Sequence, residues 1–175
     1  MDQALSALRR PHLTNLQIIF NPFRLKPLDE VLPLASEKNV AVFARVPLAS
    51  GLLSGKYTRS TTFDENDHRT YNRNGEAFDK GETFSGVPFG EGVAAADELK
   101  ASLPDGVTLP AATLAWIASR VGVTSVIPGA RSTAQAAANA GAAELLEGGF
   151  DLAAFDALVH DVYDRRLRAE IHPQW

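Results

Sequence analysis

The sequence contains no cysteine among its 175 residues, which excludes disulfide bonds, thiolate metal sites and a cysteine nucleophile. It also lacks long hydrophobic runs. No segment approaches the roughly 20 apolar residues of a membrane-spanning helix, and the N-terminus lacks the apolar core of a signal peptide. The net charge of −4 comes from interspersed acidic and basic residues, so no basic surface for nucleic acid is indicated. We therefore expect a soluble protein, compatible with the cytoplasm, without nucleic-acid or membrane partners.

The remaining composition is that of an ordinary globular protein, with 45% apolar and 22% charged residues. The length suits one domain with a core of its own. We find no repeat, low-complexity tract or internal boundary, so residues 1–175 are predicted to form a single domain. The length falls well short of the roughly 250 residues usual for a complete (β/α)₈ barrel.

Short runs of β-forming apolar residues alternate with segments of helical periodicity. We predict strands over residues 16–20, 40–44 and 123–127. Their near-continuous apolar character is typical of strands buried on both faces. We predict helices over residues 2–9, 28–38, 93–103, 108–120, 132–146 and 152–171. This alternation indicates an α/β fold in which helices cover a parallel sheet.

The segment that follows the third predicted strand is the sharpest candidate site. Gly129 permits a tight turn, and Ser132 with Gln135 three residues later matches a capping box. A helix start offers free N–H groups and the positive end of the helix dipole, which together hold anions. Arg131 adds a guanidinium group suited to phosphate. The segment indicates an anion site, but an ordinary capped turn with one solvated arginine gives the same local pattern.

Two further segments carry candidate binding residues. Arg45 stands at the end of the second predicted strand, where residues of a parallel sheet line the ligand crevice. Ser50 and Gly51 follow it and would allow a ligand close to the backbone, but an ordinary loop gives the same local pattern. Gln17 interrupts the first strand, and a buried glutamine needs a partner because an unpaired one costs ~1–3 kcal/mol. A neighbouring backbone group is the simpler partner for it, and a ligand amide is the alternative.

Residues 59–92 are polar and dense in turn formers, which is typical of a functional or disordered loop. Acidic residues gather around His68, but their spacing matches neither a calcium loop nor a zinc site. We predict a solvated, salt-bridged lid. Surface or structural roles suffice for His12, His160 and His172. There is no nucleophile elbow, Walker loop or G-x-G-x-x-G fingerprint.

Three windows in order resemble the aldo-keto reductase superfamily. Residues 17–23 (QIIFNPF) resemble its sixth strand, and residues 47–57 (PLASGLLSGKY) look like the segment after the seventh. Residues 127–132 (IPGARS), with Gln135 and Asn139, look like the eighth strand and its phosphate-clamping turn. The resemblance implies the C-terminal part of a (β/α)₈ barrel. The family chemistry that it implies is hydride transfer between NADPH and a small-molecule carbonyl substrate.

The resemblance also implies a cofactor-binding role for individual residues. Gln17 would hold the nicotinamide carboxamide, and Arg45 would lie under the nicotinamide ring. The residues along the pyrophosphate would be Pro47, Leu48, Ser50 and Gly51. The residues around the adenosine and its 2′-phosphate would be Gly129, Arg131, Ser132, Gln135 and Asn139. Gly129 stands where many members have lysine, and Ala138 where many have glutamate, so Arg131 is the main charge that favours NADP(H).

The catalytic aspartate, tyrosine, lysine and histidine of the family lie in the first half of the barrel. Tyr57, Tyr71 and Tyr163 are not in the matching context, so we expect no catalytic residue in this sequence. The first hypothesis is a cofactor-binding half of a reductase, completed by a partner that supplies the first strands. The second is a non-catalytic nucleotide-binding or structural module that self-associates through its sheet edges. The third is an unrelated α/β domain with fortuitous matches.

Overall fold

The computed structural model describes residues 1–175 and contains a parallel sheet of three strands. The strands are β1 (Asn15–Ile19), β2 (Ala41–Arg45) and β3 (Ser125–Ile127), and they lie side by side in that order. Gln17 pairs with Phe43, and Phe43 pairs with Ser125. Each crossover contains helix, as a parallel connection requires. The predicted α/β class with parallel strands is therefore confirmed.

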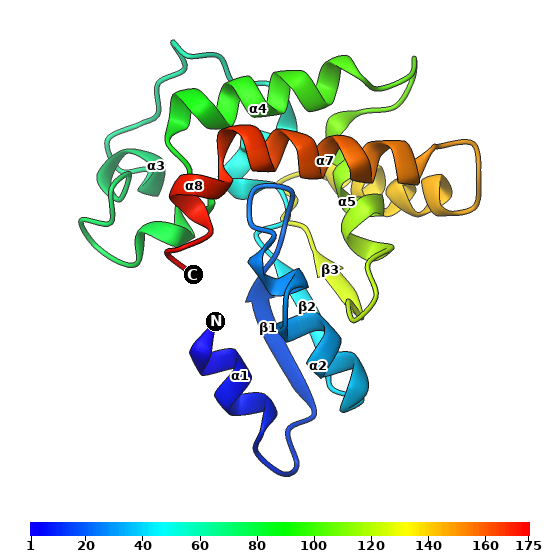
Figure 1. Ribbon diagram of the computed structural model, residues 1–175. Helices are drawn as coiled ribbons and strands as arrows, with labels where there is room; N and C mark the ends of the chain where they lie inside the picture. Colours follow the sequence, from blue (N-terminus) through cyan, green and yellow to red (C-terminus); the bar gives the residue numbers. More distant parts are fainter.

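The α-helices are α1 (Asp2–Leu8), α2 (Val31–Glu37), α3 (His68–Tyr71), α4 (Phe89–Ala101), α5 (Leu109–Ala118), α6 (Thr133–Gly141), α7 (Leu152–Arg166) and α8 (Arg168–Ile171). Shorter 3₁₀ turns are η1 (Lys26–Leu28), η2 (Ala49–Ser54), η3 (Lys80–Glu82), η4 (Phe84–Gly86) and η5 (Ala142–Leu146). Helices α4 and α7 lie side by side, with α5 against α7, and α1 and α2 lie beside the strands (Figure 1). None of the helices is long and apolar enough to cross a membrane.

Local capping chemistry sets several helix ends. Thr108 Oγ1 accepts the Ala111 N–H at 3.3 Å, which caps α5 as predicted. Asp151 caps α7 in the same way. Four predicted helices are wrong in extent. The segment 132–146 ends its α-helix at Gly141, and the segment 152–171 breaks at Leu167. The helix predicted from residue 28 begins only at Val31, and the one predicted from residue 93 begins already at Phe89.

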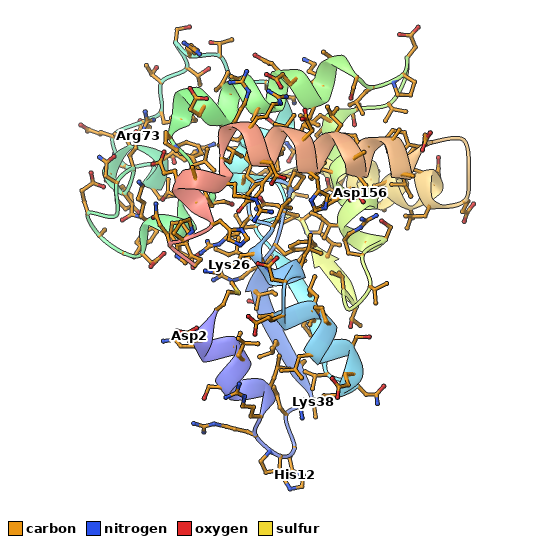
Figure 2. All side chains as sticks on the ribbon, viewed as in Figure 1. Asp2, His12, Lys26, Lys38, Arg73 and Asp156 are labelled. Atoms are coloured by element: carbon orange, nitrogen blue, oxygen red, sulfur yellow. The ribbon has the colours of Figure 1, made fainter.

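One face of the sheet packs into the hydrophobic core. Ile18, Val42 and Ala44 point to this face and belong to one cluster of buried side chains. Trp116 of α5 contributes the largest fully buried side chain, and its indole Nε1 donates to Asp156 Oδ1 at 2.7 Å. Asp156 comes from α7 (Figure 2), so this bond joins two helices of the core layer.

The other face of the sheet is largely open, so the predicted burial on both faces is wrong. Asn15, Gln17 and Ser125 are exposed there, and Ile127 remains 45% exposed. The apolar residues of each run fill the core side, and no second layer covers the other side. Strands β1 and β3 also have one unpaired edge each. The carboxyl end of β1 is the exception, because Ile19 is buried.

Candidate functional site

Two of the three predicted site segments follow the carboxyl ends of neighbouring strands, and the third, around Gln17, lies within β1. Ile19, Arg45 and Ile127 are register partners at the carboxyl ends of the three strands. Residues 47–51 follow β2 directly, and residues 129–132 follow β3. Ligands of parallel α/β sheets bind outside this edge. The structure therefore brings residues 45–51 and 129–132 to neighbouring strand ends. Gln17 lies two residues before the end of β1, on the same open face.

Arg45 forms the strongest polar contact at this edge. Its Nη1 and Nη2 donate to the two carboxylate oxygens of Glu82 at 2.5 and 2.7 Å, so the pair is bidentate. The two side chains remain 33% and 35% exposed. The hydrogen bonds from Arg45 lower the pKa of Glu82, and those bonds raise the pKa of Arg45. Both groups therefore carry their charges at neutral pH.

Ser50 and Asn21 attach the segment after β2 to the polar loop. Ser50 Oγ donates to the Glu82 carbonyl at 3.3 Å and accepts the Phe84 N–H at 3.0 Å. Asn21 is fully buried, and its Nδ2 donates to the Val46 carbonyl at 2.9 Å and to Ser85 Oγ at 2.8 Å. These hydrogen bonds thus fix the polar loop to the segments that follow β1 and β2.

Unfavourable backbone conformations cluster on the two segments that these bonds join. The left-handed φ angles after β2 are 52° at Val46, 47° at Ala49 and 54° at Ser50. Those of the loop are 54° at Phe84 and 58° at Ser85. Non-glycine residues held in sparsely populated regions cost of order 1–3 kcal/mol each, and they gather at functional sites. The cluster makes this edge of the sheet a candidate functional site.

The absence of a side chain at Gly51 makes room for the hydroxyl of Tyr57. The φ of Gly51 is 95°, and a Cβ atom at this position would collide with the hydroxyl of Tyr57. That hydroxyl donates to the Ser50 carbonyl at 3.4 Å and accepts a hydrogen bond from Arg69. Tyr57 makes the close approach to Gly51 in this structure, and the approach of a ligand to the backbone here stays a prediction.

The segment after β3 forms the predicted capped turn with two differences. Ser132 Oγ accepts the Gln135 N–H at 3.2 Å, as predicted. Gln135 Oε1 accepts the Arg131 N–H at 2.6 Å, one residue before the amide that a capping box uses. Asn139 Nδ2 donates to the Gly129 carbonyl at 3.3 Å. Gly129 has no left-handed φ, so the turn does not require glycine there.

Two polar side chains of the site have no protein partner. Gln17 is exposed rather than buried, and its amide makes no hydrogen bond, so the predicted bond to a neighbour is wrong. The cause is the open face of the sheet. The guanidinium of Arg131 is exposed and makes no ion pair or hydrogen bond. An amide and a guanidinium are thus free to bind a ligand.

Buried amide and aromatic contacts anchor part of the polar loop, residues 59–92, to the rest of the protein. Asn72 is fully buried, donates to Thr83 Oγ1 at 3.1 Å and accepts two backbone N–H groups. Arg73 lies over the ring of Phe89, the first residue of α4, at 5.0 Å from its centroid. The predicted ion pairing is present between Asp67 and Arg69. The predicted solvated, salt-bridged character is therefore confirmed in part: residues 64–66 and 74–79 are exposed, whereas buried Asn72 and the aromatic contacts of Arg73 hold the rest of the loop against the protein.

The sequence analysis missed Glu82 and Asn21. Glu82 has no local signal, because its partner lies 37 positions earlier in the chain. Asn21 lies two residues after the end of β1 and precedes a proline, and that position was its only signal. An open hollow of about 800 Å³ lies between Tyr57 and α4, but none of the predicted site residues lines it. No three histidine or acidic side chains converge on a possible metal position.

Comparison with known proteins agrees with this geometry. The aldo/keto reductase family model matches residues 2–158. The aldo-keto reductase str7 of Strobilurus tenacellus is 33% identical over 147 residues, which are 79% of this chain and 41% of that protein.

Solved structures are similar as well. Glycerol dehydrogenase AKR11B4 from Gluconobacter oxydans is 27% identical and superposes with a TM-score of 0.66 over 87% of this chain and 43% of its own. The holo form of aldo-keto reductase AKR11C1 from Bacillus halodurans is 20% identical, with a TM-score of 0.63 over 92% and 46%.

The chain thus spans less than half the length of each of these relatives. Its parallel sheet and covering helices match part of their (β/α)₈ barrel fold. The family model covers most of the sequence, and the three site segments occur in the expected order along it. The chain belongs to the aldo/keto reductase family.

Proposed function

We propose that this chain forms the cofactor-binding side of an NADP(H)-dependent oxidoreductase that interconverts a carbonyl and an alcohol. The observation that carries the proposal is the unpaired guanidinium of Arg131 at the start of α6. The first N–H groups of a helix have no intrahelical acceptor, and the helix dipole places positive charge there. This arrangement suits a phosphate group, and Arg131 favours a cofactor that carries a 2′-phosphate.

The other donors suit the remaining parts of a nicotinamide dinucleotide. The free amide of Gln17 offers a donor and an acceptor to a carboxamide group. Arg45 lies above it on the same face of the sheet and presents a planar group to an aromatic ring. Residues 47–51 follow β2, which lies between the strand of Gln17 and the strand that leads to Arg131. NADP(H), when bound, supplies or accepts the hydride, and the residues of this chain hold and orient it.

We propose that the proton for the carbonyl oxygen comes from elsewhere. Tyr163 is fully buried, and burial raises its pKa to about 12. Tyr57 is held between Ser50 and Arg69, and Tyr71 stacks edge-on against Phe78. No hydrogen bond joins any of these tyrosines to Gln17 or Arg45. A partner that supplies the first strands of the barrel would provide the catalytic acid and bring the carbonyl substrate beside the cofactor.

A non-catalytic module that associates with another chain is the second candidate. It is favoured by the open sheet face, where Ile127 is 45% exposed, and by the unpaired edges of β1 and β3. Sedimentation equilibrium across a wide concentration range distinguishes it. A dimer that binds no dinucleotide supports this candidate, and a monomer at every concentration contradicts it.

Calorimetric titration of the purified chain with NADPH and NADH tests the proposed function. We expect binding, with a preference for NADPH that falls about tenfold in Arg131→Ala, because a charge-assisted hydrogen bond contributes about 1.5–3 kcal/mol. Arg9→Ala is the matched control, because Arg9 is exposed at the end of α1 and its side chain makes no contact. Binding that is equal in Arg131→Ala and the parent chain would contradict the role given to Arg131.

A further inference from the structure

We infer that Glu82 is a positioning residue that fixes Arg45 and balances its charge, and thereby sets the relative affinity of the site for oxidised and reduced nicotinamide. The inference rests on the proposed function, because it requires that a nicotinamide ring lies beside Arg45. It assigns a role to a residue of the polar loop that is distant in sequence from every proposed cofactor-binding residue.

The first step concerns orientation. A free arginine side chain has many rotamers, but a bidentate carboxylate fixes the plane of its guanidinium group. Both nitrogens of Arg45 are bound in this way by Glu82, at 2.5 and 2.7 Å. Glu82 is itself fixed, because its N–H donates to the Asp79 carbonyl at 3.0 Å and its carbonyl accepts from Ser50. The orientation of Arg45 therefore depends on the docked loop.

The second step concerns charge. Glu82 is the one acidic side chain within ion-pair distance of Arg45. The Glu82 carboxylate also interacts electrostatically with the guanidinium group of Arg24. Arg24 is buried, with only 4% of its surface exposed, and donates to the Gly81 carbonyl. Arg24 thus interacts with the carboxylates of Asp79 and Glu82, whereas Arg45 has Glu82 alone. Removal of the charge of Glu82 leaves Arg45 uncompensated at the open face of the sheet.

The third step concerns the ligand. The oxidised nicotinamide ring carries a positive charge, and the reduced ring is neutral. An uncompensated guanidinium group beside the ring disfavours the oxidised form by Coulomb repulsion and leaves the neutral form nearly unaffected. The carboxylate of Glu82 removes most of that repulsion. A merely structural role of Glu82 would weaken the binding of both forms together.

The test measures the dissociation constants of NADP⁺ and NADPH for the purified full chain and for Glu82→Gln. We expect the ratio of the NADP⁺ constant to the NADPH constant to rise about tenfold in Glu82→Gln, the effect of one unit charge about 4 Å from the ring at an effective dielectric constant of about 60. The same change raises the midpoint potential of the bound couple by about 30 mV. The effect should shrink at high ionic strength, because salt screens it.

Three variants make the test specific. Glu65→Gln removes an exposed carboxylate of the same loop that makes no contact, so its ratio should remain that of the parent chain. Glu82→Asp keeps the charge and should keep the ratio within about threefold of the parent value. In the double variant Arg45→Gln/Glu82→Gln both charges are gone, and the ratio should return toward the parent value. Circular dichroism of each variant verifies the fold.

The outcomes separate this inference from the proposed function. A raised ratio in Glu82→Gln that the double variant restores supports the inference. Equal weakening of both forms, with an unchanged ratio, overturns it while the proposed function stands. A parent chain that binds neither form overturns both.

Discussion

Replacement of Asn21 by alanine should destabilise the protein more than most single substitutions. The side chain is fully buried and takes part in three hydrogen bonds, to the Val46 carbonyl, to Ser85 Oγ and from the Phe23 N–H. A net hydrogen bond contributes about 0.5–1.5 kcal/mol, and each buried partner left unsatisfied adds a further penalty. Relaxation of the left-handed residues Val46 and Ser85 offsets part of the loss. We expect a loss of about 2–3 kcal/mol in the free energy of unfolding.

Urea unfolding followed by far-ultraviolet circular dichroism measures this loss. The Asn21→Asp variant keeps the size of the side chain and the acceptor for Phe23, but it has no amide to donate, so it should be destabilised as well. Asn66→Ala is the control, because Asn66 is exposed and bonds only to nearby Asp64. A loss below about 0.5 kcal/mol for Asn21→Ala, the range of an ordinary surface substitution, would refute the argument that Asn21 ties the loop to the strand ends.

Two further predictions concern the same edge of the sheet. The hydrogen bonds from Arg45 lower the pKa of Glu82 below its ordinary 4.5. The stabilisation that ionised Glu82 contributes is therefore full above pH 4.5 and is lost as the pH falls through the lower, folded-state pKa. The difference in the free energy of unfolding between the parent chain and Glu82→Gln, measured by urea unfolding from pH 7 to pH 3, should shrink below about pH 4.5. Gly51→Ala should cost about 1–3 kcal/mol in urea unfolding, because the left-handed φ disfavours alanine and Tyr57 occupies the space of the new methyl group; an unchanged midpoint would contradict the structure at this position.

The elements that local chemistry controls could be predicted from the sequence. Thr108 and Ser132 begin helices because their side chains bond to amides three residues later, and such bonds depend only on the adjacent sequence. The three strands could also be predicted from adjacent residues, because each is a short apolar run between turn-forming residues.

The burial of those strands could not be predicted. A continuous apolar run is the same whether one or two layers cover a sheet, and only the fold shows that Gln17 and Ile127 lie on an open face. The pair of Arg45 with Glu82 was invisible for a related reason. Their contact joins positions 37 residues apart, through a loop whose polar composition suggests solvation. Long-range pairing is a property of the folded chain and leaves no periodic signal in the sequence.

The most direct test of the proposed cofactor site is a ¹⁵N–¹H correlation spectrum of the isolated chain, titrated with NADPH. We predict dispersed peaks and shifts centred on two segments, residues 45–51 and 129–139, with a further shift at the side-chain amide of Gln17. Peaks that remain unchanged at saturating NADPH, or shifts confined to the hollow beside α4, would contradict the proposal that this edge of the sheet binds the cofactor.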